Sequence, residues 1–242
     1  MVSRTAFSTD SLEKLPIEEG VSLIRKAYDI GVNFYHIANE SVKSKETLGY
    51  AFHGMRKEIF ISVASSALEN ISLQQEIITT LDSLNSSYID IFSIHNNSFV
   101  PKKNTLDGLY TTLLSAKADE NIKAIGFSTN NLDLANEALE SELYDLIILN
   151  VSLDNLIAQD VIKFSDSCRK KETSLIVNYN TPISEEPNLS LIFGFLRKSE
   201  NIIPLWNITN QNNLQTLINF EANLPQFSEE DLEKLNRKQD SN

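Results

Sequence analysis

The chain has 242 residues and a formal net charge of -12, from 33 Asp and Glu against 21 Lys and Arg. This length can bury a large core, and the 41% hydrophobic and 22% charged residues are typical of a folded globular protein. The acidic balance argues against a nucleic-acid or anionic-membrane partner, because both depend on Lys and Arg. The single cysteine, Cys168, excludes an internal disulfide and a cysteine-based metal cluster.

No apolar run approaches the ~18 residues of a membrane span, and the first ten residues lack the apolar stretch of a signal peptide. We therefore expect a cytoplasmic protein with no membrane partner and no nucleic-acid partner. A protein partner or a small polar ligand stays open, as does the oligomeric state.

Short runs rich in Ile, Val and Phe alternate with longer segments of helical periodicity. The runs predict strands at 32–38, 59–65, 89–95, 123–128, 146–152, 174–179 and 202–206. The periodic segments predict helices at 16–30, 44–52, 73–84, 106–118, 132–143, 158–171, 189–198 and 213–220. Because the first of these helices lacks a preceding strand in this reading, we expect one more strand at 4–7.

Repeated βα units without a composition break or a linker predict an α/β fold, a single-domain (β/α)8 TIM barrel with short active-site loops over residues 1–227. The rival is a doubly wound open sheet, which usually carries a Gly-rich turn after its first strand. The chain has only seven Gly and no such turn. The segment that starts SEEDLEKL predicts a short C-terminal helix and a polar tail over 228–242.

The active site of a barrel forms at the C-terminal ends of its strands. His36 and His95 lie at predicted strand ends, whereas His53 lies at a predicted helix end and is expected to face solvent. The other polar candidates at strand ends are Asn39, Ser65, Ser66, Asn96, Asn97, Ser128, Thr129, Asn130, Asn131, Asn150, Ser152, Asn178, Asn180 and Asn207.

Four segments resemble motifs of the aldo-keto reductase superfamily. GVNFYHIANESVKSKETLGYAF is similar to G-[IV]-N-x-[FY]-D-T-A-x-x-Y-G-x-S-E-x-x-[LI]-G, and YIDIFSIHNN is similar to Y-[IL]-D-L-x-L-I-H-x-P. IKAIGFSTNNLDLANEAL resembles [IV]-R-x-[IL]-G-[VL]-S-N-[FH] with its helix, and NIIPLWNITNQNNLQTL resembles the last strand, [VI]-[IV]-P-x-x-G. The segments follow the family order over nearly the whole chain. The resemblance implies a TIM barrel, in agreement with the count of βα units.

The resemblance also implies carbonyl reduction with NADPH by an Asp, a Tyr, a Lys and a His. In that family the Tyr supplies a proton, the Lys lowers its pKa, the Asp holds the Lys and the His orients the carbonyl. Here the Asp position holds His36, the Tyr position Ser41, the Lys position Ala64 and the His position His95. Because general acid catalysis contributes roughly 10²–10⁴-fold, these replacements predict a member that has lost ordinary turnover.

The cofactor site that the resemblance implies is also incomplete. The family holds the 2'-phosphate of NADPH with basic residues after the last strand, but no Lys or Arg lies between Lys198 and Lys234. No cofactor is therefore firmly predicted, although NADPH stays possible. The residues expected to contact it are Ser128, Thr129, Asn150 and Tyr179, of which the tyrosine would stack on nicotinamide.

Three functions stay open. The first is a non-catalytic binding or regulatory protein, a pseudoenzyme that keeps the family fold. The alternative is an NADP-dependent oxidoreductase, or another enzyme of altered chemistry, with His95, His36 and Ser41 as candidate catalytic residues. The third is an intact reductase whose Tyr and Lys come from other positions, for which the candidates are Tyr35, Tyr50 and Lys43.

Two further side chains carry expectations. Trp206 is expected either to fill the vacated cofactor cleft or to pack at the barrel end, and Cys168 is expected to be a buried, inert thiol. No metal site is predicted, because a His36 and His95 pair would need a third ligand.

Overall fold

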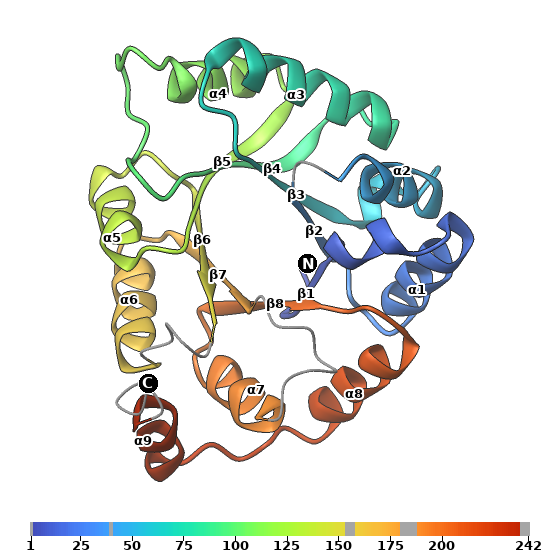
Figure 1. Ribbon diagram of the computed structural model, residues 1–242, viewed down its shortest axis with the longest axis vertical. Helices are drawn as coiled ribbons and strands as arrows, with labels where there is room; N and C mark the ends of the chain where they lie inside the picture. The colour runs from blue at the N-terminus through green and yellow to red at the C-terminus, as the bar shows by residue number, and fades with distance from the viewer. Residues whose placement is uncertain (1, 39–40, 153–157, 180–187, 238–242) are drawn as a thin grey trace.

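The computed structural model describes residues 2–38, 41–152, 158–179 and 188–237. Eight parallel strands close into a barrel in chain order, and helices surround it (Figure 1). The strands are β1 (Ala6–Ser8), β2 (Phe34–Ala38), β3 (Phe60–Ser65), β4 (Ile89–His95), β5 (Ile122–Thr129), β6 (Leu146–Val151), β7 (Ser174–Tyr179) and β8 (Ile202–Asn207). The predicted single-domain TIM barrel is confirmed, including its extra first strand.

The helices lie close to the segments that the periodicity predicts. They are α1 (Ile17–Asp29), α2 (Val42–Ala51), α3 (Asn70–Leu84), α4 (Leu109–Ala118), α5 (Leu132–Ser141), α6 (Ala158–Lys170), α7 (Leu189–Lys198), α8 (Gln211–Ala222) and α9 (Glu229–Arg237). α4 starts later than predicted because Gly108, with φ of 66°, adopts a left-handed conformation that a helix cannot continue. Two short 3-10 helices, η1 (Asp10–Lys14) and η2 (Arg56–Glu58), were not predicted.

The strands bury both faces, as expected of a parallel barrel. Outward side chains such as Phe7, Val63 and Phe127 pack under the helices. The inner core is smaller and consists of Ala6, Phe34, Leu146, Ile148, Ile176 and Leu205. These inner residues fill the lower part of the barrel, so the upper part is left to other side chains.

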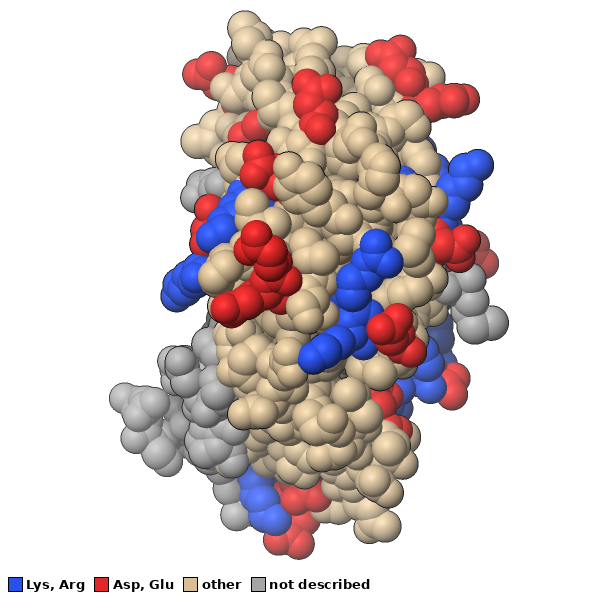
Figure 2. Space-filling view, turned by 90° about the vertical axis from the view of Figure 1, so that its right-hand side faces the viewer, with Lys and Arg blue, Asp and Glu red and all other residues tan. Residues whose placement is uncertain are grey.

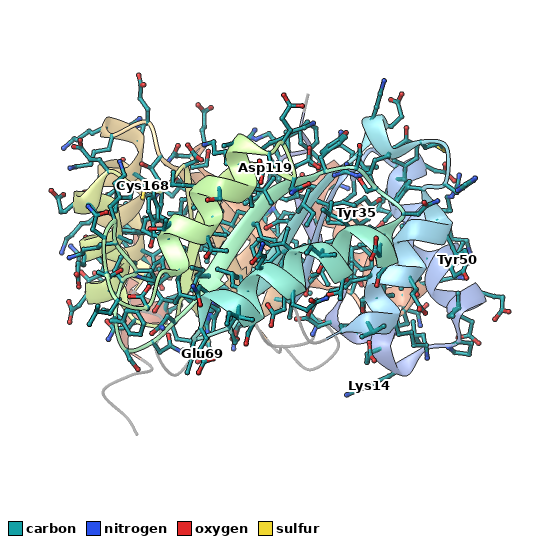
Figure 3. The ribbon with its side chains drawn as sticks, turned by 90° about the horizontal axis from the view of Figure 1, so that it is seen from above. Lys14, Tyr35, Tyr50, Glu69, Asp119 and Cys168 are labelled. Atoms are coloured by element: carbon teal, nitrogen blue, oxygen red, sulfur yellow. The ribbon has the colours of Figure 1, made fainter. Side chains whose placement is uncertain are left out.

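The two ends of the barrel can be told apart in Figure 3. Lys14 follows β1 and Glu69 follows β3, and both lie at the edge where the strands end. Asp119, at the end of α4, lies at the opposite edge. The edge marked by Lys14 and Glu69 is therefore the mouth, where barrel active sites form.

A partly buried ion pair strengthens the barrel away from the mouth. Asp90 Oδ2 accepts hydrogen bonds from Arg56 Nη2 at 2.6 Å and from the Ile61 N–H at 3.0 Å. The Arg56 guanidinium also donates to the carbonyls of Ile59 and Tyr88, both at 3.0 Å. One charge pair thus ties β3, β4 and the turns before them together.

α9 forms where the sequence predicts a C-terminal helix. Ser228 Oγ accepts the Asp231 N–H at 3.2 Å, and Asp231 Oδ2 accepts the Ser228 N–H at 3.0 Å, so the two residues cap the helix reciprocally. The polar tail from residue 238 and the connection at 180–187, where short active-site loops were expected, lie outside the described residues.

None of the helices in the described part of the chain is both long and apolar enough to span a membrane. On the face at the right of Figure 1, acidic and basic side chains are interspersed (Figure 2).

Candidate active site

The mouth of the barrel has an uncharged, hydrogen-bonding floor. The strand register and the alternation along each strand turn one set of side chains inward just below the mouth. The set consists of Ser8, His36, Ala38, Ala64, His95, Ser128, Asn150, Asn178 and Asn207. TIM barrels usually fill these layers with bulky branched residues. Here His, Asn, Ser and Ala take their place.

Half of this floor forms one continuous hydrogen-bond network across β4 to β7. Asn178 Nδ2 donates to Asn150 Oδ1 at 2.8 Å, and Asn150 Nδ2 donates to Ser128 Oγ at 3.0 Å. Ser128 Oγ in turn lies 3.0 Å from His95 Nδ1. The asparagines and Ser128 are buried. Side chains at the ends of β5, β6 and β7 therefore position the imidazole of His95 at the end of β4.

The network also fixes the tautomer of His95. Asn97 Oδ1 accepts the Asn130 N–H at 2.7 Å and the Thr129 hydroxyl at 2.9 Å, so the amide group that faces His95 Nε2, at 3.3 Å, is the NH2 donor. His95 Nε2 is then the acceptor, and Nδ1–H donates to Ser128. Burial lowers the pKa of His95, which favours this neutral form.

His36 is the more deeply buried histidine. Its side chain faces inward on β2, and Nδ1 lies 3.2 Å from Ser62 Oγ. Burial lowers its pKa from 6.5 to about 4; Asp10 opposes the shift and His95 adds to it. His36 is therefore neutral at physiological pH.

Ser41, which the sequence aligns with the family Tyr, is engaged in local structure. Its Oγ accepts the Ser44 N–H at 3.2 Å and thereby caps the N-terminus of α2. The Ser41 hydroxyl also hydrogen-bonds the Glu13 carboxylate of η1. These contacts explain a buried serine here without any catalytic role.

The candidates for a relocated Tyr and Lys lie apart from the floor. Tyr35 points outward from β2, and its buried phenol donates to the Val32 carbonyl at 2.7 Å. Tyr50 is 65% exposed on the outer side of α2 (Figure 3). Lys43 is partly exposed, and its Nζ donates to the Glu13 carbonyl at 3.3 Å. The alternation along β2 that turns His36 inward turns Tyr35 outward.

The two aromatic residues expected near a cofactor lie in the outer core. Trp206 is fully buried and stacks on Phe193 of α7, with ring centroids 5.4 Å apart. Trp206 therefore packs between β8 and α7 and does not fill the mouth. Tyr179 is also fully buried in this outer core, whereas Asn178 before it faces inward. The ring of Tyr179 is therefore buried among other residues of the outer core.

A buried lysine beside the mouth was missed. Lys45 of α2 is 5% exposed, and burial lowers its pKa while the Glu76 carboxylate opposes the shift. Glu76 accepts a hydrogen bond from Ser65 at the end of β3. The available signal was the motif G-x-S-E, in which Lys45 occupies the Glu position.

Within the described part of the chain, no cluster of three or more His, Cys, Asp or Glu side chains could hold a metal ion. Cys168 is fully buried on α6, and burial raises the pKa of its thiol to about 12. His53 is exposed. Asn39 and Asn180 lie outside the described residues.

Comparison with known proteins identifies the family. The aldo/keto reductase family profile matches residues 5–181. The chain belongs to the aldo/keto reductase family. In this family member the match ends within the segment after β7, so β8 and α8, where the phosphate grip is expected, lie beyond it. No curated protein sequence matches the chain.

Solved aldo-keto reductases share the fold at low sequence identity. An enzyme from Klebsiella pneumoniae in complex with NADP and acetate is 14% identical, with a TM-score of 0.77 over 98% of this chain and 91% of that one. One from Bacillus halodurans in its holo form is 13% identical, with a TM-score of 0.76 over 97% and 92%. A putative aldo-keto reductase from Pseudomonas aeruginosa is 17% identical, with a TM-score of 0.75 over 90% and 88%.

Proposed function

We propose that this aldo/keto reductase family member is a pseudoenzyme, which binds a small polar ligand or a protein partner at the barrel mouth and does not transfer hydride. The proposal is carried by the chemistry of two side chains, Ser41 and Ala64, which the sequence aligns with the family Tyr and Lys. Ser41 caps a helix, and Ala64 offers only a methyl group. A developing alkoxide would meet no positioned acid there, and this loss costs roughly 10²–10⁴-fold in rate.

His95 does not compensate for the missing acid. To orient a carbonyl oxygen, an imidazole must present an N–H donor to it. Here Nδ1–H is directed at Ser128, and Nε2 accepts from Asn97. Both ring nitrogens of His95 are thus engaged by neighbouring side chains, and neither presents an N–H group to a carbonyl at the mouth.

NADPH fits the residues present poorly. Ser128, Thr129 and Asn150, the polar contacts expected for it, hydrogen-bond one another or their neighbours. The stretch after β8 supplies no Lys or Arg for a 2'-phosphate before Lys234. The Klebsiella relative is described with NADP bound. We infer that this chain has lost that affinity, and we derive no step through the cofactor.

The test is NADPH-dependent reduction of a panel of aldehydes and ketones by the purified protein, with the Klebsiella reductase as positive control. We expect oxidation of NADPH at the rate without protein. Turnover at the rate of the positive control would overturn the proposal. A cytoplasmic location belongs to the same proposal and is tested by fractionation.

The second candidate is an enzyme of altered chemistry centred on His36 and His95. It is favoured by one observation: the two imidazoles interact electrostatically across the floor of the mouth. A base whose pKa is about 4 is poorly matched to neutral pH, because efficiency is greatest when the pKa lies near the working pH. If His36→Asn and His95→Asn left every detected activity unchanged, this candidate would fail.

A further inference from the structure

A groove lies between α1 and α8, which are neighbours in the ring of helices (Figure 1). Its walls are the residues before β1, the turn from α1 to β2 and one side of α8. The groove therefore borders the ends at which β1 and β2 begin, away from the mouth. Its volume of about 440 Å³ falls in the range of small-molecule pockets, roughly 300–1,000 Å³.

Most of the surface of this α1/α8 groove is apolar. Leu214 and Leu217 of α8 form its buried base, and Ile218 beside them is partly exposed. On the opposite wall Ile30 is 47% exposed, and Val32 is partly exposed. Single exposed apolar side chains are common, but several that line one concave surface are typical of a binding groove.

Two charged side chains line the α1/α8 groove, and only one of them is neutralised. Glu221 Oε2 accepts a hydrogen bond from Arg197 Nη2 at 2.9 Å, and Glu221 Oε1 accepts one from the Thr5 hydroxyl. Arg4 is exposed, and its guanidinium has neither an ion pair nor a hydrogen bond within the described residues. The groove thus offers one uncompensated positive charge beside an apolar surface.

The backbone around Arg4 is held in place. The Ser3 N–H donates to Asn33 Oδ1 at 2.7 Å, and the Asn33 N–H donates to Ser3 Oγ at 3.2 Å. Arg197 Nη1 donates to the Arg4 carbonyl at 3.3 Å. These contacts fix the segment that carries Arg4 against the barrel and leave its guanidinium available to a ligand.

From these features we propose that the α1/α8 groove binds a medium-chain fatty carboxylate. The hydrocarbon chain lies along Leu214, Leu217 and Ile218, where its burial is favourable, and the carboxylate pairs with Arg4. One guanidinium balances the single charge of a carboxylate, whereas a phosphate monoester would bring additional negative charge close to Glu221. The site is separate from the barrel mouth and goes beyond the function proposed for it.

The overall charge of the protein makes this preference a specific one. With a net charge of -12, the chain as a whole repels anions and attracts cations. A carboxylate that binds more tightly than an ammonium of the same chain length must therefore owe its binding to a local cation. Arg4 is the cation that lines the groove.

The experiment is a titration of nitrogen-labelled protein with hexanoate, octanoate and decanoate below their micelle-forming concentrations, followed in proton–nitrogen correlation spectra. The Gly31 amide lies in the groove and reports binding, and the Gly54 amide outside it is the internal control. We expect saturable shifts at Gly31, with an affinity that rises by up to about fourfold per added methylene. Octylammonium and octyl phosphate should bind more weakly than octanoate.

Variants at exposed positions separate the contribution of the charge from that of the apolar chain. Arg4→Gln should weaken octanoate binding about threefold, as expected for one exposed charge pair, and leave octanol binding unchanged. Ala222→Glu, which adds a carboxylate to the groove, should have the same selective effect. The control is Lys103→Gln, at an exposed lysine before α4, which should change neither. The urea midpoint of each variant should match the wild type.

Four results would overturn the proposal. They are no saturable shift at Gly31 with any of the carboxylates, an affinity that does not rise with chain length, octylammonium or octyl phosphate binding as tightly as octanoate, and octanoate affinity unchanged, or reduced no more than that of octanol, in both Arg4→Gln and Ala222→Glu. None of these results depends on NADPH binding or turnover at the mouth.

Discussion

The buried His36 should make the stability of the protein fall in weak acid, and His36→Asn should remove that dependence. In the folded state its pKa is about 4, against 6.5 when exposed. Between these values the unfolded chain binds more protons than the folded one, so stability present above about pH 6.5 is lost as the pH falls. At about 1.4 kcal/mol per pKa unit, the loss is about 2 kcal/mol between pH 7 and pH 5 and about 3 kcal/mol by pH 4.

The assay is urea unfolding of wild type and His36→Asn at several pH values. At neutral pH the variant should lose only the hydrogen bond to Ser62, about 1 kcal/mol. At about pH 5 the difference in free energy of unfolding between the two proteins should close or reverse. Only in the wild type does protonation of His36 stabilise the unfolded state. The control is His53→Asn, at an exposed histidine, which should keep the wild-type slope. An unchanged slope in His36→Asn would mean that His36 does not cause the loss of stability in acid.

Three further predictions concern the barrel and the helices around it. Asp90→Ala leaves the Arg56 charge and the Ile61 N–H without their partner and should lower the free energy of unfolding by about 3–5 kcal/mol in urea; a loss below 1 kcal/mol would mean that the pair behaves as a surface one. In Gly126→Ala the new Cβ would lie 2.1 Å from Ser93 Oγ, so we expect a loss of about 1–3 kcal/mol that the added change Ser93→Gly partly restores; equal stability of the two variants would count against this packing. Cys168, with its thiol buried, should react with a disulfide reagent only in urea, and rapid labelling of the native protein would contradict its placement.

The barrel could be predicted from sequence because its signals are periodic. Apolar runs such as Ile89–His95 alternate with amphipathic helices, and a missing strand could be inferred by counting. The start of α4 could not be predicted, because the left-handed Gly108 separates Leu106 from the helix that begins at Leu109. Leu106 itself is fully exposed.

For the candidate site, the alternation of side chains along each strand predicts which residues face inward. Parity turns His36 inward and Tyr35 outward, and the same argument sets Tyr179 against the inward Asn178. The role of Lys45 could not be read in this way, because it depends on how α2 packs beside Glu76 and the end of β3. The tautomer of His95 depends on Asn97, whose position after β4 follows no periodic rule.

The most direct test of the central claim is a calorimetric titration of the purified protein with NADPH, with NADP+ and NADH in parallel. Because the polar contacts of the expected nicotinamide site are engaged and no basic residue is available for the 2'-phosphate, we expect no binding heat at millimolar cofactor. Micromolar binding of NADPH would contradict it and would return the protein to the oxidoreductases of its family.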